Sequence, residues 1–144
     1  MRTITFYTRM LTIFAALTFA AGCAQESAPT PAAVGPDITA AELNERIANN
    51  TAPLILDVRS SDEYTAGHLP NALNIVHTEF VEFPAETLAL LPANPDTEIV
   101  IHCVSGKRAG IATEVIVAAG YTNVRPLTGH FQGWQAANYV IVLD

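Results

Sequence analysis

Basic residues and cysteines are both scarce in this chain of 144 residues. Lysine and arginine together number seven against fourteen acidic residues, which leaves a net charge of −7. A chain this acidic is a poor candidate for binding nucleic acid, because the phosphate backbone is contacted through a basic surface. The cysteines are only two, Cys23 and Cys103, so disulfides and thiolate metal sites are already limited by composition.

The first 22 residues do not have the composition of a folded domain. Arg2 and Arg9 are the only charges before an apolar stretch at 10–21, which is too short for a membrane-spanning helix. This pattern predicts a signal peptide over residues 1–22. Its removal would leave five basic residues against fourteen acidic ones, a net charge of −9.

Residues 20–23, Ala-Ala-Gly-Cys, resemble the lipobox of bacterial lipoproteins, with alanine in place of the usual leucine. The resemblance implies that Cys23 becomes the lipidated N-terminus and attaches the protein to a membrane. Because residue 24 is alanine and not aspartate, it also implies the outer membrane of a bacterial cell envelope, facing the periplasm. The proline- and alanine-rich residues 23–37 predict an extended tether. The alternative is an ordinary signal peptide that leaves Cys23 free.

A lipid on Cys23 would leave Cys103 without a partner in the chain. No structural disulfide would then be possible, and no thiolate zinc site could be built, so no metal or other cofactor is predicted. A single thiol kept in an oxidising compartment is exposed to over-oxidation. Its presence there favours a functional role.

Cys103 begins the most informative segment of the chain, a loop between a strand and a helix. An apolar run at 98–102 predicts the buried strand, and residues 109–119 predict the helix, closed by Gly120. At such a turn, backbone N–H groups and the helix dipole favour the thiolate, as do two nearby cations. We predict that Cys103 is a nucleophile; the alternative is a buried cysteine that only fills space. The loop reads Cys103-Val104-Ser105-Gly106-Lys107-Arg108.

Predicted strands alternate with predicted helices along residues 38–144. This order is typical of a single α/β domain, and we expect a mainly parallel sheet of about five strands with helices on both faces. Besides the strand before Cys103, strands are expected at 53–58, at 72–76, near 124 and, as an edge strand, at 139–143. Helices are expected at 40–49, 61–66, 84–91 and 131–137, the first two beginning at capping boxes, Thr39 to Glu42 and Ser60 to Glu63.

The carboxyl ends of two predicted strands carry charged or nucleophilic residues. Ligands of open parallel sheets bind at these ends. Asp57 and Arg59 follow one strand and Cys103 follows another, so Arg59 is expected to add positive potential near the thiol. Asp57 is expected to hold the rim through an ion pair with Arg59 rather than to react. By strand alternation, His102 and Cys103 should project to opposite faces, which makes His102 a weak candidate for a base.

Taken together, these segments resemble the rhodanese domain family from about residue 38 to the end of the chain. The resemblance implies a sulfurtransferase. The thiolate of Cys103 would take the outer sulfur of a small anionic donor, thiosulfate above all, and pass it from a persulfide to a thiol or cyanide acceptor. The segments that match are Leu56-Asp57-Val58-Arg59, Glu63-Tyr64, residues 67–75 beginning with Gly67-His68, the Cys103 loop, Gly120-Tyr121, Val124, Leu127 and Trp134.

The resemblance also implies roles for individual residues. Backbone N–H groups of the loop would hold the charge of the persulfide, while the two loop cations would attract the donor and balance the intermediate. His68 is expected to act as a structural hydrogen-bonding residue. His130 stands where the family often has glycine. Its imidazole could tune the choice of substrate, but it is expected to point to solvent. The substrate-binding residues implied are Val104, Ser105, Gly106, Lys107, Arg108 and Arg59.

Two other classes of function remain open. A cysteine phosphatase or arsenate reductase also places a cysteine loop before a helix, but the usual phosphatase spacing has five residues between cysteine and arginine. Here there are four, and Ala109 stands at the phosphatase position. A non-catalytic module that carries sulfur or binds a partner is the other alternative. Inactive relatives commonly lose the cysteine, which this chain keeps.

Overall fold

A computed structural model describes residues 34–143, so the predicted signal peptide, Cys23 and most of the predicted tether lie outside the described residues. Within 34–143, no helix combines the length and the apolar character needed to cross a membrane. In chain order the elements are α1 (Ala40–Ala48), β1 (Leu54–Asp57), α2 (Ser61–Thr65), β2 (Ala72–Asn74), α3 (His77–Glu82), α4 (Pro84–Leu88), β3 (Ile99–His102), α5 (Lys107–Ala118), β4 (Val124–Pro126) and α6 (His130–Ala136).

The sheet has four parallel strands in the order β2-β1-β3-β4. The register is set at the centre, where Leu56 of β1 lies opposite Leu73 of β2 and Ile101 of β3. The α/β class and the parallel sheet are therefore confirmed. Residues 139–143, expected as an edge strand, form only a single antiparallel bridge between Val142 and His68. Both hydrogen bonds of that bridge join these two backbones, and no ladder extends from it.

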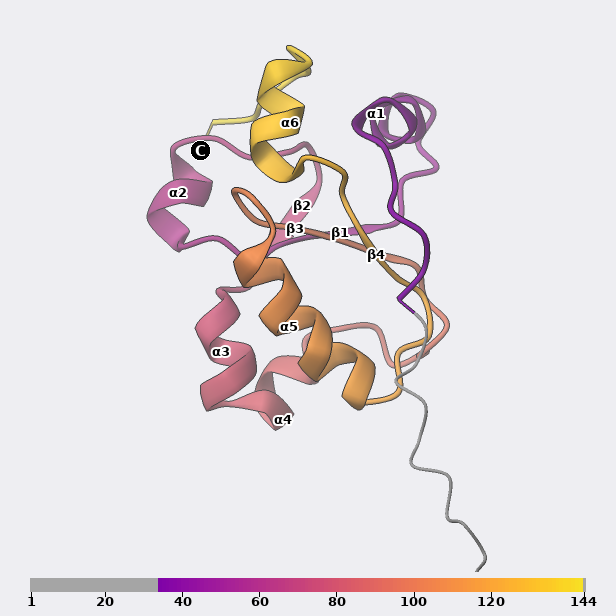
Figure 1. Ribbon diagram of the computed structural model, residues 1–144, viewed down its shortest axis with the longest axis vertical. Helices are drawn as coiled ribbons and strands as arrows, with labels where there is room; N and C mark the ends of the chain where they lie inside the picture. The colour runs from indigo at the N-terminus through magenta and orange to yellow at the C-terminus, as the bar shows by residue number, and fades with distance from the viewer. Residues whose placement is uncertain (1–33, 144) are drawn as a thin grey trace, which may run out of the picture.

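The strands alternate their side chains between two hydrophobic layers. On β1, Leu56 packs with Phe80 of α3 and Ile116 of α5, whereas Ile55 packs with Leu43 of α1 and Trp134 of α6. Figure 1 shows the result: α3, α4 and α5 lie on one side of the sheet, and α1 and α6 lie on the other. Helices on both faces agree with the sequence-based expectation.

Two of the helices that the sequence predicted begin at capping side chains, whereas a helix that it did not predict begins without one. Ser60 and Glu63 form a complete capping box at α2. At α1 only half of the expected box forms: Thr39 accepts from the backbone of Glu42, whose carboxylate lies 3.6 Å from Arg125. Helix α3 was not expected, because its N-cap, Val76, offers no capping side chain.

Candidate active site

The loop between β3 and α5 surrounds the sulfur of Cys103 with backbone N–H groups. The amide of Gly106 donates to Sγ at 3.1 Å. Burial raises the pKa of the Cys103 thiol, but hydrogen bonds from the backbones of Ala109, Gly106, Ser105 and Arg108 outweigh it and leave the pKa below its ordinary value. Because these donors stabilise the thiolate, the loop supplies the surroundings of a nucleophile.

Gly106 allows the chain to make this turn, and His130 packs against it. The φ angle of Gly106 is +112°, a region that side chains other than glycine's rarely occupy. A Cβ added at Gly106 would lie 2.7 Å from Nε2 of His130. Nδ1 of His130 is buried without a hydrogen-bond partner among the described residues. The expectation that His130 points to solvent is therefore wrong: α6 folds back over the loop and brings the imidazole to its rear.

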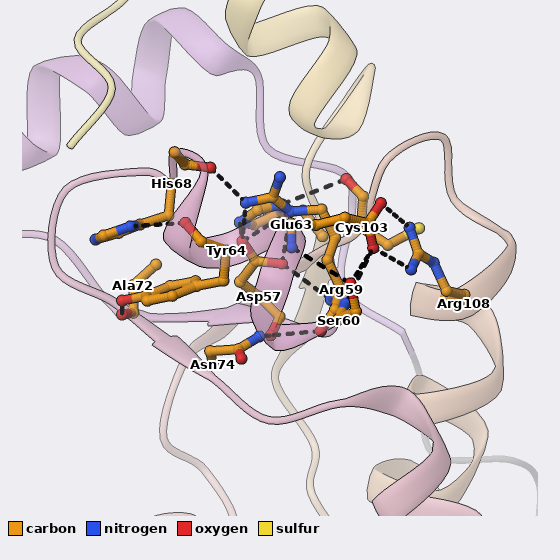
Figure 2. A network of polar contacts seen from close by, with 12 residues as sticks. Asp57, Arg59, Ser60, Glu63, Tyr64, His68, Ala72, Asn74, Cys103 and Arg108 are labelled. Atoms are coloured by element: carbon orange, nitrogen blue, oxygen red, sulfur yellow. Dashed lines mark hydrogen bonds and ion pairs between the residues drawn. The ribbon is translucent and has the colours of Figure 1, made fainter. Parts of the chain in front are cut away.

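Arg108 is paired with a carboxylate from α2. Its guanidinium binds Glu63 through two hydrogen bonds, of 2.6 and 2.9 Å, and Figure 2 shows this pair beside the sulfur. The hydrogen bond from Arg108 lowers the pKa of Glu63 to about 2, against the opposing effect of burial and with help from Ser60. The interaction with Glu63 raises the pKa of Arg108, as does its interaction with Cys103. Arg108 thus interacts with Cys103 while its positive charge is compensated by the carboxylate of Glu63.

Arg59, two residues after β1, forms its contacts within the protein itself. Its guanidinium donates to both oxygens of Asp57 (Figure 2) and to the carbonyl of Gly67. It also lies 3.8 Å from the centre of the Phe131 ring. Only 2% of the residue is exposed. The ion pair with Asp57 is the rim-holding arrangement anticipated from the sequence. Arg59 places positive charge near the site, but its guanidinium is already bonded to Asp57 and to the carbonyl of Gly67.

His102, the last residue of β3, and His68 both stack on aromatic rings. His102 stacks on Phe131, on the face of the sheet opposite to the layer that contains Cys103. Burial lowers the pKa of His102 to about 4, although Asp57, 3.7 Å away, acts in the other direction. His102 is therefore neutral at pH 7. His68 stacks on Tyr64 with ring centres 3.8 Å apart, and its Nδ1 lies 3.2 Å from the carbonyl of Tyr64.

Lys107 differs from every other basic residue that the structure describes. The four arginines in residues 34–143 all form ion pairs with carboxylates. Lys107, at the start of α5, is exposed and has no carboxylate partner in that range. Val104 is half-buried and Ser105 exposed, so this part of the loop meets solvent. No group of three or more histidine, cysteine or acidic side chains suited to a metal occurs in the described part of the chain.

A cleft of about 350 Å³ adjoins the loop on the side of α6. Arg59, Glu63, Val104 and Phe131 contribute to its lining, together with residues that the sequence did not single out, Gln132 and Gln135. The capping box indicated that Glu63 begins a helix, but its ion pair with Arg108 joins residues 45 positions apart. No local pattern signals such a contact.

Comparisons with known proteins find a family and several similar sequences and structures. The family model described as "Rhodanese-like domain" matches residues 39–137. Thiosulfate:glutathione sulfurtransferase of Homo sapiens is 35% identical over 107 residues, covering 69% of this chain and 92% of that protein. Thiosulfate sulfurtransferase 18 of Arabidopsis thaliana is 37% identical over 90 residues, covering 55% of this chain and 64% of that protein.

Other relatives are longer proteins or solved structures. A tRNA uridine(34) hydroxylase of Photorhabdus laumondii is 29% identical over 99 residues, but the chain spans only 28% of its length. Among solved structures, a rhodanese-related protein of Thermoplasma volcanium is 29% identical with a TM-score of 0.62. The match covers 76% of this chain and all of that one (100%).

Proposed function

The chain belongs to the family of rhodanese-like domains, and from this membership and the Cys103 loop we propose that it is a thiosulfate sulfurtransferase. The observation that carries the proposal is the buried sulfur of Cys103, which accepts a hydrogen bond from the backbone N–H of Gly106 at 3.1 Å. Against the opposing effect of burial, the pKa of this thiol is lowered by hydrogen bonds from the backbones of Ala109, Gly106, Ser105 and Arg108. They stabilise the thiolate that must attack. They are equally suited to the negative charge of a persulfide. Two similar proteins of the family are thiosulfate sulfurtransferases by name.

The proposed reaction has two steps that share Cys103. In the first, the thiolate attacks the outer sulfur of thiosulfate; a bond forms between Sγ and that sulfur, and the sulfur–sulfur bond of thiosulfate breaks. The electron pair leaves with sulfite, and the enzyme holds an anionic persulfide. In the second step, cyanide or a thiolate attacks the terminal sulfur, and the electron pair of the broken bond returns to Sγ. Total charge is conserved in each step.

The charges around the loop support an anionic donor. Arg59 and Arg108 are balanced by Asp57 and Glu63, so neither leaves a strong net charge for a second anion. Lys107 is exposed and unbalanced within residues 34–143, and we assign to it the attraction of thiosulfate. Arg108, which interacts with Cys103, would donate a hydrogen bond to the anionic intermediate.

Mass spectrometry of the purified protein tests the proposal directly. Incubation with thiosulfate should add one sulfur atom at Cys103, and cyanide should remove it as thiocyanate. Cys103→Ser should give neither reaction while keeping its fold by circular dichroism. Full thiosulfate:cyanide activity in that variant would falsify the assignment.

The same assay separates the alternatives. Sulfur loading without catalytic turnover would indicate a sulfur carrier. Hydrolysis of an aryl phosphate, or reduction of arsenate, without loading by thiosulfate would indicate a phosphate-binding loop instead. The spacing of four residues between Cys103 and Arg108 favours the sulfur reaction.

We also propose that the domain is anchored by lipid at Cys23 in a bacterial cell envelope, on the periplasmic face of the outer membrane. The support is the signal-like start, residues 20–23 and the proline-rich stretch that follows. Labelled palmitate should enter the wild-type protein and not Cys23→Ser. Release of an unmodified protein into the periplasm would leave only the secretory part of the proposal.

A further inference from the structure

The cleft beside the Cys103 loop is separate from the backbone N–H groups that face the sulfur, but the two sites adjoin one another. Val104 lines the cleft and follows Cys103 directly. Glu63 lines it too, and its partner Arg108 interacts with the sulfur. The cleft lies between α2 and α6, which flank the carboxyl end of the sheet in Figure 1. The cleft is thus bordered by the residue that follows Cys103 and by the carboxylate that pairs with Arg108.

The charged groups of this cleft are already compensated. Its lining contains two, Arg59 and Glu63. Arg59 is paired with Asp57 at 2.6 Å, and Glu63 is paired with Arg108 at 2.6 Å. An anion that entered the cleft would therefore meet each positive charge beside a negative one. The cleft favours a ligand without net charge.

Apolar surface makes up much of the wall. Val104, Phe131 and Ile141 contribute side chains from the loop, from α6 and from the C-terminal segment. The Phe131 ring is held from one side by the guanidinium of Arg59. Such a wall suits the aliphatic part of a thiol, which gains from leaving water. Cyanide is too small to cover it.

Two amide side chains stand at the edge of this wall. Gln132 and Gln135 lie three residues apart on α6 and so share a face of the helix. Both are exposed, and no hydrogen bond of either side chain to another part of residues 34–143 is present. Each amide offers a donor and an acceptor, which is the complement of a backbone amide in a ligand.

The first turn of α6 is fastened to the loop that carries the sulfur. The backbone N–H of Phe131 donates to the carbonyl of Cys103 at 2.9 Å, and that of Gln132 donates to the carbonyl of Val104 at 3.3 Å. The backbone from which the glutamine side chains project is thereby fixed relative to the reactive end of the loop. This preorganisation reduces the entropy lost when a ligand spans both.

We propose that this cleft is the acceptor subsite and that it takes an uncharged thiol bearing amide groups, such as a cysteine within a peptide. Gln132 and Gln135 hydrogen-bond the amides of the acceptor, and the apolar wall covers its side chain. After the thiol loses its proton to solvent, its sulfur bonds to the terminal sulfur of the persulfide. The bond from that sulfur to Sγ breaks, and the acceptor leaves as a persulfide. The inference rests on the proposed sulfurtransferase function.

Discharge of protein preloaded with thiosulfate tests the subsite. The acceptors are N-acetylcysteine amide, which is uncharged, N-acetylcysteine, which carries a carboxylate, and cyanide. In the wild type, the KM for the amide should be lower than that for the carboxylate when thiolate concentrations are matched. Replacing both glutamines, as Gln132→Ala with Gln135→Ala, should raise the KM for the amide about five- to tenfold relative to the KM for cyanide.

A matched loss of an amide elsewhere serves as the control. Asn49 is exposed at the end of α1 and does not line the cleft, so Asn49→Ala should leave all three KM values unchanged. If the double glutamine variant keeps the ratio of the thiol KM to the cyanide KM within twofold of wild type, the subsite is wrong. Equal KM values for the two thiols in the wild type would also overturn it. Failure of the wild type to load sulfur or to react with cyanide would instead refute the proposed function, and the subsite with it.

Discussion

Cys103 owes its predicted reactivity to donors that belong to its own loop. The N–H groups lower the pKa of the thiol although burial acts in the opposite direction. Because a lowered pKa leaves more thiolate at neutral pH, alkylation by iodoacetamide should reach half its maximal rate below the midpoint of a free cysteine, which is about 8.5. A chain with Cys23→Ser leaves Cys103 as the single thiol for this titration. Unfolding in urea should return the midpoint to the ordinary value, and a native midpoint above it would contradict the thiolate cradle.

Lys107 should act on the donor through charge alone. Because the side chain is exposed, Lys107→Ala should lower kcat/KM for thiosulfate only about two- to fivefold at low ionic strength, and the difference should fade as salt is added. Lys107→Arg keeps the charge and should behave as wild type. A loss that is the same at every ionic strength would show that Lys107 acts by contact rather than by attraction.

Gly106 occupies a position of the loop where a side chain is poorly tolerated. In Gly106→Ala, the added methyl would meet Nε2 of His130, and the backbone would be strained at φ +112°. Since the loop would shift its N–H away from Sγ, sulfur transfer should fall about 10- to 100-fold in a steady-state assay.

Two further variants identify the cause of that loss. Gly110→Ala places a methyl in open space on the exposed side of α5 and should keep full activity. Adding His130→Gly to Gly106→Ala removes the clash but leaves the backbone strain, so activity should return in part. No return at all would mean that His130 does not restrain the loop.

At the scale of elements, α2 is the part that holds Arg108 in place. Its capping box positions Glu63, which accepts from both the N-cap backbone and the guanidinium of Arg108. Ser60→Ala removes the cap and should lower the free energy of unfolding by about 1 kcal/mol, measured by urea denaturation. Ser61→Ala, at the next and exposed position, should change it little. Equal destabilisation by both variants would argue against the capping role.

At the scale of the whole molecule, Glu98 joins three parts of the chain that lie far apart in sequence. Its carboxylate binds Arg46 of α1 and Arg125 of β4 just before β3 begins. The hydrogen bond from Arg46 lowers the pKa of Glu98 to about 2 from 4.5, burial opposing and Arg125 assisting. A lowered pKa means that the contribution is complete above pH 4.5 and is lost as the pH falls through about 2.

The corresponding variant is Glu98→Gln. It should lower the free energy of unfolding by on the order of 1 kcal/mol at pH 7, a figure kept small because the groups are partly exposed to water. Below pH 4.5 the gap to wild type should narrow. Glu86→Gln changes an exposed carboxylate that has no ion pair within the described residues, and it should have no such pH-dependent effect. A gap that is constant down to pH 2 would contradict the role of the Glu98 charge.

The amino-acid sequence by itself determined the features that depend on residues close together in the chain, such as where a strand lies or where a helix begins. An apolar run predicted β3, and strand alternation predicted the opposite directions of His102 and Cys103. Ser60 with Glu63 predicted the start of α2. Two local predictions were nevertheless incomplete: one helix was missed, and one expected strand did not form. Helix α3 has no capping side chain, and residues 139–143 make one bridge rather than a strand, because pairing is decided by the partner as much as by the segment.

Only the tertiary structure decided which side chains meet across the site. Glu63 neutralises Arg108 from 45 residues away, and His130 lies behind Gly106 instead of in solvent. Gln132 and Gln135 border the cleft because the first turn of α6 is bonded to the Cys103 loop. The physical reason is common to all three. Caps and alternation act over a few residues of one segment, whereas charge compensation and cleft walls arise when separate segments are packed onto the same edge of the sheet.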